Sequence, residues 1–471
     1  MAHPENSPVR NSEFAVALLV AGTFFMENLD ATVITPAIPK IAHSFGVQPV
    51  DLHSGVSAYL LTLGIFIPIS GWVAERFGAR KVFATAIFIF TLASALCGFA
   101  HTSTQFLQTR IFQGIGGAMM VPVGRLSVLR VTPKERLIKA IAALTWPGLV
   151  APVLGPPLGG FISDNADWRW IFYINIPLGL LAFATALRLI PSDNQSEQRP
   201  FDWLGFLFVG GGLFSLLFAA ETLTQAQTPV LELVISALVG VILLVLGTIH
   251  LKRTPNPMIS LDVVRIPTFS VAVRGGSIFR MGVSAVPFLL PLMFQLGFGY
   301  TSFHAGMMLM AVFAGNLSMK PLTTMIMRRF GFRRVLLANG ILNAIFIAAI
   351  ATFTATTSPI IMCVILFIGG MNRSLQFTTF NSIAFADVPQ NRISAANTLF
   401  SSAFQLAMGG GVAAAAIAWR IGQSLQPNFS PDPVIPFRIA FILLATLALT
   451  SLLDTLRLNP AAASHVIGRG K

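Results

Sequence analysis

The octapeptide ERFGARKV at residues 75–82 returns as RRFGFRRV at residues 328–335, 253 positions later. The two copies share Arg, Phe, Gly, Arg and Val in the same order. The same offset carries the start of the first apolar run, near Phe14, to residue 267, and a later apolar run does begin beside Pro267. The sequence therefore predicts two halves that are built on one plan and in one register.

The composition is that of a chain embedded in lipid. Only 10% of the 471 residues are charged and 54% are hydrophobic, whereas a soluble domain carries about 25% charged residues. Apolar runs of about 18 residues or more, long enough to span a membrane, recur along the whole chain. Cys97 and Cys363 lie in different apolar runs without a CxxC partner, so neither a disulfide framework nor a zinc site is expected.

Cutting the apolar runs at charged, Pro-rich and Gly-rich breaks gives fourteen transmembrane spans in an all-α polytopic membrane protein. The expected spans begin near residues 14, 50, 82, 105, 138, 170, 202, 230, 268, 303, 335, 359, 397 and 437. We expect an N-terminal six-helix bundle at 1–190, a linker with two extra transmembrane helices at 191–266, and a C-terminal six-helix bundle with a short cytoplasmic tail at 267–471. Two parallel six-helix halves are the plan of one large class of secondary transporters.

The basic residues indicate how the chain is oriented, because Lys and Arg of short loops are retained in the cytoplasm. With the N-terminus inside, the opposite loops hold only Lys40, Arg169, Arg420 and Arg438, and an even span count places both termini in the cytoplasm. The net charge of +13 is dispersed over the loops, which argues against nucleic-acid binding. The first run is too long and too acidic for a cleaved signal peptide. We therefore expect a multi-pass protein of a bacterial cytoplasmic (inner) membrane.

Five N-terminal segments resemble motifs of one family of membrane transporters. GWVAERFGARKVF at 71–83 resembles its second-to-third-loop motif, although Glu75 stands where Asp is usual; RIFQGIGGAMM at 110–120 resembles its fourth-span motif. WPGLVAPVLGPPLGG at 146–160 looks like the fifth-span motif of its antiporters. LDATVITPAIP, from Leu29, and DWRWIFYINIPLG at 167–179 are similar to its fourteen-span drug:proton antiporter branch. Together these segments resemble the major facilitator superfamily, and the resemblance implies the major facilitator fold and multidrug efflux.

Two of these motifs suggest moving parts. The loop motif holds Gly71, Glu75, Arg76, Gly78, Arg80 and Lys81. Its glycines permit a close approach and a tight turn, and Glu75 between two arginines can form a switchable gating network, whereas the cations alone would only anchor the topology. The fifth span concentrates Gly148, Pro152, Gly155, Pro156, Gly159 and Gly160. Proline kinks a helix and small residues allow close packing, so this span is either a bendable helix for alternating access or a close-packed one.

Charges inside the spans are costly, at about 2.5 to 3.5 kcal/mol each at a helix centre. Three long cations lie close enough to the cytoplasmic ends of their spans to reach the membrane interface: Arg125, Lys320 and Arg373. Arg274 and Arg280, in the first half of the ninth span, could either reach the interface or stay inside. Asp30 is different, because a short carboxylate about four turns into the first span cannot reach the interface. Arg110 lies at a similar depth in the fourth span, which runs the opposite way, so these two residues can pair.

A pair of this kind can respond to protons. Burial favours the neutral form of a carboxyl group and a nearby cation favours the ionised form, so opening the pair would change whether Asp30 holds a proton. We therefore expect Asp30 to be the main proton-coupling carboxylate, tuned by Arg110. A static buried salt bridge is the alternative.

Glu27 precedes Asp30 by three residues and shares its helix face, so it is expected to look into the transport cavity. Two carboxylates this close disfavour joint ionisation, and a cationic substrate could replace the proton that one of them holds. Glu27 is thus a candidate substrate-binding residue. The alternatives are a hydrogen bond within the bundle or a pair with a basic residue of the C-terminal half, such as Arg280, which is the second candidate substrate-binding residue.

No enzyme pattern competes with transport. The seven histidines include no HExxH pair and there is no Walker A sequence for ATP, while GIGGA lies inside an apolar span rather than after a strand. We expect no cofactor and no metal, but a proton-coupled antiporter that exports small lipophilic, drug-like compounds by alternating access. The other possible functions are a proton- or sodium-coupled uptake symporter, a transport-dead sensor and a polytopic membrane enzyme. The expected partners are the lipid bilayer, protons and the substrate; a periplasmic adaptor protein would leave no mark in the sequence.

Overall fold

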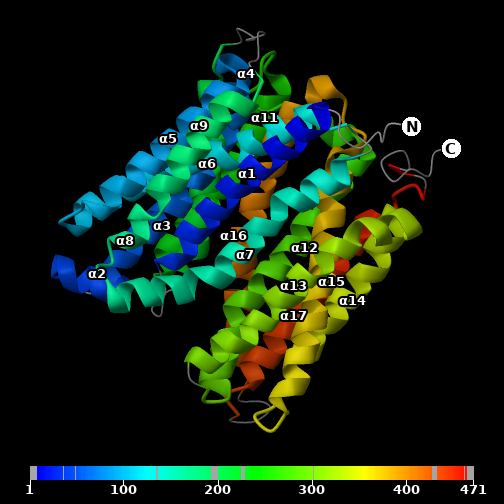
Figure 1. Cartoon of the computed structure of the whole chain (residues 1–471). Helices are drawn as coiled ribbons and strands as arrows, with labels where there is room; N and C mark the ends of the chain where they lie inside the picture. Colours follow the sequence, from blue (N-terminus) through cyan, green and yellow to red (C-terminus); the bar gives the residue numbers. More distant parts are fainter. Residues whose placement is uncertain are drawn as a thin grey trace, which may run out of the picture. The chain divides into compact units, whose positions relative to one another are not determined.

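A computed structural model describes residues 8–34, 37–47, 49–133, 136–191, 200–223, 229–300, 302–426, 432–460 and 462–463 (Figure 1). The chain divides into two compact units. Unit 1 contains residues 1–214, 240–261 and 389–402, and unit 2 contains residues 215–239, 262–388 and 403–471. The division runs through three long helices, α10 (Trp203–Thr222), α11 (Val230–Arg253) and α16 (Ile393–Leu425).

The N-terminal helices of unit 1 follow the expected spans. They are α1 (Pro8–Val33), α2 (Ile38–Phe45), α3 (Pro49–Phe66), α4 (Ser70–Phe77), α5 (Ala79–Gly98), α6 (Ser103–Val131), α7 (Leu137–Asn165), α8 (Trp170–Tyr173) and α9 (Asn175–Leu189). Within the unit, α1 packs along α7 and also against α6 and α9, while α5 and α3 pack against α6. These contacts place α1 and α6 side by side, so that side chains from their facing surfaces can meet.

Unit 2 has its own helices and its own core. They are α12 (Pro267–Leu292), α13 (Ser302–Phe330), α14 (Phe332–Ile350), α15 (Pro359–Ala386), α17 (Ile435–Thr450) and α18 (Leu452–Leu456). Helix α13 packs along α15, and α14 packs against α15 and α17. Leu289, Phe294 and Phe441 belong to the apolar core that these helices enclose.

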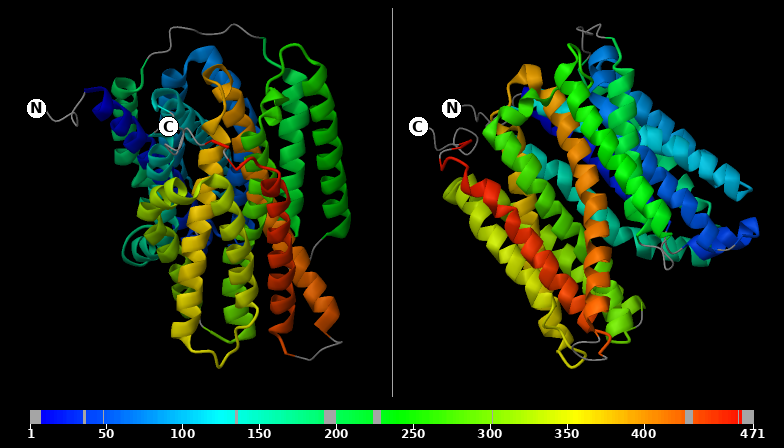
Figure 2. Two further views of the ribbon diagram at one scale, coloured as in Figure 1. Left: turned by 90° about the vertical axis from the view of Figure 1, so that its right-hand side faces the viewer. Right: turned by 180° about the vertical axis from the view of Figure 1, so that it is seen from behind.

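The parts of α10 and α11 that belong to unit 1 lie side by side (Figure 2). Gly212 of α10 faces Leu244 of α11 so closely that a Cβ would stand 2.8 Å from its side chain. Asp202, just before α10, accepts a hydrogen bond from Nε2 of His250 at 2.8 Å. These two helices occupy the 191–266 stretch that was expected to hold two extra spans.

The repeated octapeptide forms the same turn twice. Gly78 between α4 and α5 has a φ of 85°, and Gly331 between α13 and α14 has a φ of 82°. Both angles lie where glycine is tolerated and other residues are strained. The helix that was expected to open the second half begins at Pro267, as the offset requires. The internal register read from the sequence is therefore present in the backbone.

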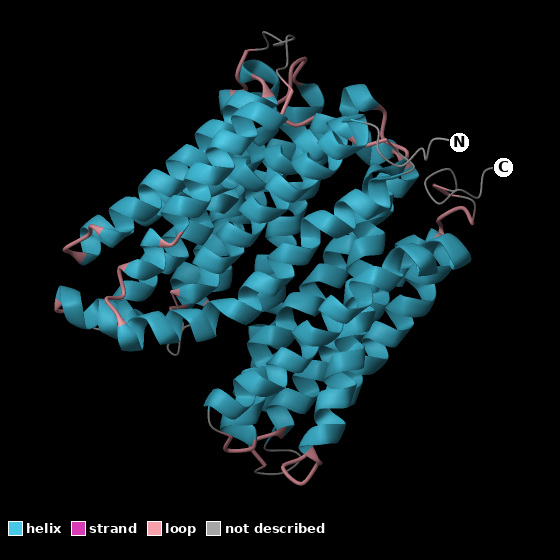
Figure 3. Cartoon of the chain, viewed as in Figure 1, coloured by secondary structure: helices cyan, strands magenta, loops and turns pink. Residues whose placement is uncertain are grey.

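The expected all-α class is confirmed, since the described residues form helices and loops without a strand (Figure 3). Each of the fourteen predicted span starts lies within six residues of the start of a helix. Twelve helices of the described chain are long and apolar enough to cross a membrane. Helices α7 and α13, at the fifth and tenth predicted spans, are not among these twelve. The count of fourteen spans thus stays a prediction, as do the bounds of the three predicted domains.

Candidate functional site

Asp30 lies at the centre of a buried hydrogen-bond network in unit 1. Its side chain is fully buried in α1, and its Oδ2 accepts a hydrogen bond from Nη1 of Arg110 at 2.7 Å. The other oxygen, Oδ1, accepts from Nε2 of Gln113 at 3.0 Å and from Nδ2 of Asn175 at 2.8 Å. Both carboxylate oxygens are therefore satisfied, and the expected meeting of Asp30 with Arg110 occurs.

Arg110 is held on one side by Asp30 and on another by an aromatic ring. The same Nη1 donates to Oε1 of Gln113 at 2.6 Å, and the guanidinium carbon lies 4.4 Å from the ring centre of Tyr59. A cation over an aromatic face is attracted by the ring quadrupole. Its Nε and Nη2 are buried and donate no hydrogen bond within the described residues. Two nitrogen donors of Arg110 are therefore without an acceptor among the described residues.

A second layer of side chains fixes the network in place. Nδ2 of Asn175 also donates to Oγ of Ser94 at 2.9 Å, which links α9 to α5. Phe106, one turn before Arg110 on α6, packs edge-on against Phe172 with ring centres 5.7 Å apart. This apolar cluster holds the start of α6 in place near α8. Helices α5, α8 and α9 therefore help to hold the ion pair between α1 and α6 in place.

Gln113 and Asn175 were not singled out from the sequence. Both stand in quoted motifs, RIFQGIGGAMM and DWRWIFYINIPLG, as neutral polar residues among apolar ones. Such residues inside the membrane require partners, and this requirement was the available signal. Their burial completes a carboxylate environment with three donors.

Glu27 stands apart from this network although it lies one turn away. Its side chain is half-buried, and its Oε2 is buried without a hydrogen bond in the described chain. The hydroxyl of Tyr59 is likewise buried and unbonded there. A Cβ on Gly117 would stand 3.2 Å from that hydroxyl and 3.7 Å from Cδ of Glu27, so both groups border one small residue. The structure thus places Glu27 beside Tyr59.

The loop motif covers α4 and the start of α5. Gly71 allows a close approach to α16, because a Cβ would collide with Oγ1 of Thr398 and stand 3.4 Å from Oγ of Ser394. Glu75 lines a space of about 510 Å³ together with Arg130 and Arg392. The described positions show no ion pair between Glu75 and the neighbouring cations of the motif, which are half-exposed or exposed: Arg76, Arg80 and Lys81.

The glycine- and proline-rich motif belongs to α7, which runs continuously from Leu137 to Asn165. Gly155 lies against α1, since a Cβ would collide with Oγ1 of Thr32 and stand 3.2 Å from its backbone carbon. Gly148 is looser, with Nδ2 of Asn28 at 3.5 Å, and Gly160 faces open space. Pro152 is half-buried and Gly159 is buried, whereas the side chain of Pro156 lies outside the described residues. The motif therefore packs α7 closely against α1 at one point.

Unit 2 holds its buried cations among rings and neutral groups. The guanidinium carbon of Arg280 lies 5.1 Å from the ring centre of Phe404 and 5.8 Å from that of Phe377, and its Nη1 donates to the carbonyl of Ala272 at 3.4 Å. Nζ of Lys320 donates to Oγ1 of Thr378 at 2.9 Å. Unit 2 thus accommodates positive charge with aromatic rings and hydroxyl or carbonyl oxygens.

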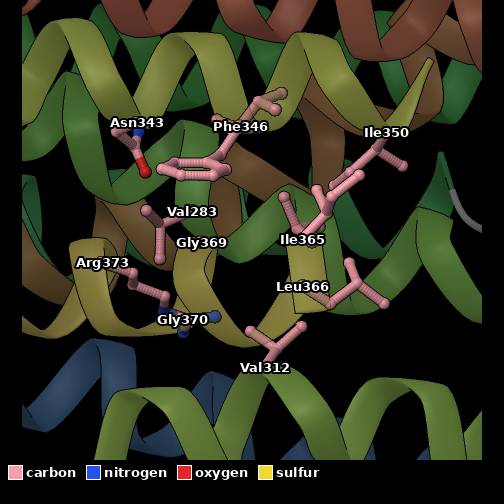
Figure 4. A pocket seen from close by; sticks show the side chains of 12 residues that line it. Val283, Val312, Asn343, Phe346, Ile350, Ile365, Leu366, Gly369, Gly370 and Arg373 are labelled. Carbon is pink, nitrogen blue, oxygen red and sulfur yellow. The ribbon is translucent and has the colours of Figure 1, made fainter. Parts of the chain in front are cut away.

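A small space lies beside a third cation of unit 2, the half-buried Arg373. Figure 4 shows Arg373 and Asn343 on its wall, with Phe346 and aliphatic side chains around them. Its volume is about 30 Å³, which is room for about one water molecule. The space is too small for a drug-like compound, which needs about 300 Å³ or more.

Comparisons with known proteins identify the class of protein. A family model described as Major Facilitator Superfamily matches residues 20–412 and 275–466. The chain belongs to the major facilitator superfamily of membrane transporters. The resemblance of the five N-terminal segments to that family is thereby confirmed.

Two relatives share most of the chain. A protein named multidrug resistance protein MdtD from Pectobacterium carotovorum is 36% identical over 412 residues, which are 88% of each chain. The protein of the same name from Escherichia coli O6:H1 is 37% identical over 399 residues, covering 85% of this chain and 84% of that protein.

Two solved structures share the fold. The human organic anion transporter MFSD10 has a TM-score of 0.68 at 14% identity and covers 96% of this chain and 100% of its own. The proton:xylose symporter XylE bound to 6-bromo-6-deoxy-D-glucose has a TM-score of 0.65 at 15% identity, with coverage of 95% and 96%. These similarities show the major facilitator fold, which was expected. Family membership and the apolar helices make the chain a multi-pass membrane protein.

Proposed function

We propose that this protein is a proton-coupled antiporter that exports small lipophilic compounds across a bacterial cytoplasmic membrane. The observation that carries the proposal is the buried pair of Asp30 and Arg110 inside a member of a transporter family. The relatives named for multidrug resistance support drug-like substrates. The expected orientation, with fourteen spans and both termini in the cytoplasm, is part of the same proposal.

The pair has the chemistry that coupling requires. In the arrangement described, Asp30 compensates the charge of Arg110 and no net charge is buried between them. Protonation of the centre would remove that compensation, and the unbonded Nε and Nη2 of Arg110 would then need a new partner. Because an uncompensated buried charge is costly, a proton in this centre changes which conformation of the surrounding helices is stable. A static salt bridge would bind no such proton.

The two motif helices would supply the movement. Gly71 permits α4 to lie against α16, and Gly155 permits α7 to lie against α1. Glycine lets two helix backbones approach closely. Because it has no side chain, such a contact can separate and re-form without changes of side-chain rotamers. We assign the loop motif, with Glu75 and its cations, to a gate and α7 to a helix that shifts during alternating access.

The test is transport driven by an imposed pH gradient in inside-out vesicles, with the cationic dye ethidium as probe. Vesicles with an acidic lumen should accumulate the dye when they contain the protein, and collapse of the gradient should release it. An uptake symporter would be driven in the opposite direction. A sensor or an enzyme would give no gradient-dependent accumulation, and this result across a panel of lipophilic compounds would refute the proposed function.

A further inference from the structure

Four long helices of unit 2 carry cations but no carboxylate. The sequence has no Asp or Glu between Asp262 and Asp387, and this stretch contains all of α12, α13, α14 and α15. Three of its cations lie more than two turns from either end of their helices: Arg280, Lys320 and Arg373. No side chain of these four helices can therefore compensate a buried positive charge with a negative one.

Arg373 differs from the other two cations in its surroundings. Arg280 lies over two phenylalanine rings, and Lys320 donates to the hydroxyl of Thr378. Arg373 of α15 is half-buried, and its Nη1 is buried and donates no hydrogen bond within the described residues. Because a buried polar group without a partner costs free energy, an acceptor is expected beside this nitrogen.

The space of about 30 Å³ beside Arg373 is bordered by a second unbonded donor. Asn343 of α14 is 5% exposed, and its Nδ2 is buried without a hydrogen bond in the described chain. A half-turn of the amide presents either its oxygen or its nitrogen. Figure 4 places Asn343 and Arg373 at one end of the space, and Ile350 and Leu366 at the other. The space therefore has one end that can donate hydrogen bonds and one apolar end.

The charges around this space favour an anion over a water molecule. Of the helices packed against α14 and α15, α12 and α13 contribute only cations and α17 contributes no acid. Asp454 of α18 lies within 4.0 Å of Arg274. A water molecule would leave the charge of Arg373 uncompensated, whereas a monovalent anion would compensate it. A volume of about 30 Å³ admits one ion of the size of water and excludes a drug-like anion.

We propose that unit 2 binds a small monovalent anion of the size of chloride between Arg373 and Asn343. The anion supplies the negative charge that the four helices lack, as Asp30 supplies it to Arg110 in unit 1. Half-burial of Arg373 leaves the ion a way to reach the guanidinium. The anion stabilises unit 2 and takes no part in proton coupling, so this inference does not rest on the proposed antiport.

Thermal unfolding of the purified full-length protein in detergent tests the site, with chloride as the probe. Gluconate, an organic anion too large for the space, replaces chloride at constant ionic strength. The unfolding temperature of the wild type should rise with chloride concentration and level off, by about 2 °C or more in total. Radiolabelled chloride should bind over the same range of concentrations. The absence of a saturable response, or of saturable binding, would overturn the proposal.

Two variants and a control locate the ion. Arg373→Gln removes the charge and should abolish both the temperature shift and chloride binding. Arg328→Gln, at an exposed cation in the last turn of α13, is the matched control and should keep both. A response that persists in Arg373→Gln, or one that is lost equally from the control, would mean that chloride acts elsewhere and would overturn the proposal.

The sharpest variant places a carboxylate where the anion is proposed to bind. In gluconate, Asn343→Asp should unfold at or above the temperature of the wild type, because its side chain now compensates Arg373. Added chloride should no longer raise that temperature. An Asn343→Asp protein that is less stable than the wild type in gluconate, or that still gains stability from chloride, would contradict the proposal.

Discussion

The two units share a turn and differ in the charge that they bury. Gly78 of unit 1 and Gly331 of unit 2 take nearly the same φ in the repeated octapeptide. Inside the helices, however, unit 1 pairs a guanidinium with a carboxylate, at Arg110 and Asp30. Unit 2 places the Arg280 guanidinium over phenylalanine rings. The repeat therefore preserves backbone geometry and not the surroundings of these two arginines, and for that reason we assign the proposed proton coupling to unit 1.

The difference has an energetic consequence. A buried ion pair is held by the mutual compensation of its partners, so the loss of one partner leaves the other uncompensated. A guanidinium over rings is held by a weaker, distributed attraction, of about 0.5 to 2 kcal/mol. The loss of stability caused by a substitution should therefore be larger in unit 1 than in unit 2, and unfolding experiments can measure this difference.

The largest effect is expected from breaking the ion pair of unit 1. Asp30→Asn keeps the shape of the side chain but leaves the charge of Arg110 uncompensated, and loss of one partner from a buried pair costs about 3 to 5 kcal/mol. Chemical unfolding of the purified protein in detergent measures this loss. The double variant Asp30→Asn with Arg110→Gln should recover part of it. A double variant less stable than either single variant would contradict the account of the pair.

The next effect concerns the contact between α1 and α7. Gly155→Ala adds a methyl group against Thr32, where no space exists, and overpacking of this kind costs about 1 to 3 kcal/mol. Gly160→Ala on the same helix is the matched control, because nothing lies within 4 Å of its Cβ position. Thermal unfolding and dye efflux should both be impaired in the first variant only. Equal behaviour of the two variants would show that α7 does not pack as described.

The shared turn offers a test of equality between the units. Alanine at Gly78 or at Gly331 would be forced into a backbone conformation that costs about 1 to 3 kcal/mol. We expect similar losses of stability for the two variants, measured by the same unfolding assay. A cost confined to one of them would mean that the two turns are not equivalent, and the comparison of the units would lose its common reference.

The smallest effect is expected in unit 2. Arg280→Lys keeps the positive charge but loses the planar group that lies over Phe377 and Phe404. The loss of the ring contacts alone should cost no more than about 2 kcal/mol, and gradient-driven efflux should persist. Efflux of ethidium and of a neutral compound, each compared with the wild type, measures the variant. Complete loss of coupling would place an essential charge in unit 2 and break the contrast between the units.

The sequence was sufficient for the helices and for the ion pair, but not for the surroundings of the pair. Apolar runs with charged and glycine-rich breaks fix where helices begin, and the depth of two charges in spans of opposite direction brings Asp30 and Arg110 together. The partners Gln113, Asn175 and Tyr59 depend on which faces of α6, α9 and α3 turn towards α1, which is a property of packing. The contact of Gly71 with Thr398 joins segments more than 300 residues apart, and no local pattern predicts it.

The most direct test of proton coupling in unit 1 compares two modes of transport in one preparation of proteoliposomes. Wild-type protein should accumulate ethidium against its gradient when a pH gradient is imposed, and it should also exchange labelled for unlabelled dye without one. Asp30→Asn protein, reconstituted at the same density, should lose gradient-driven accumulation. The result predicted is a loss of at least about tenfold, which corresponds to 1.4 kcal/mol or more of lost coupling. Accumulation at the wild-type level in Asp30→Asn would contradict the central claim.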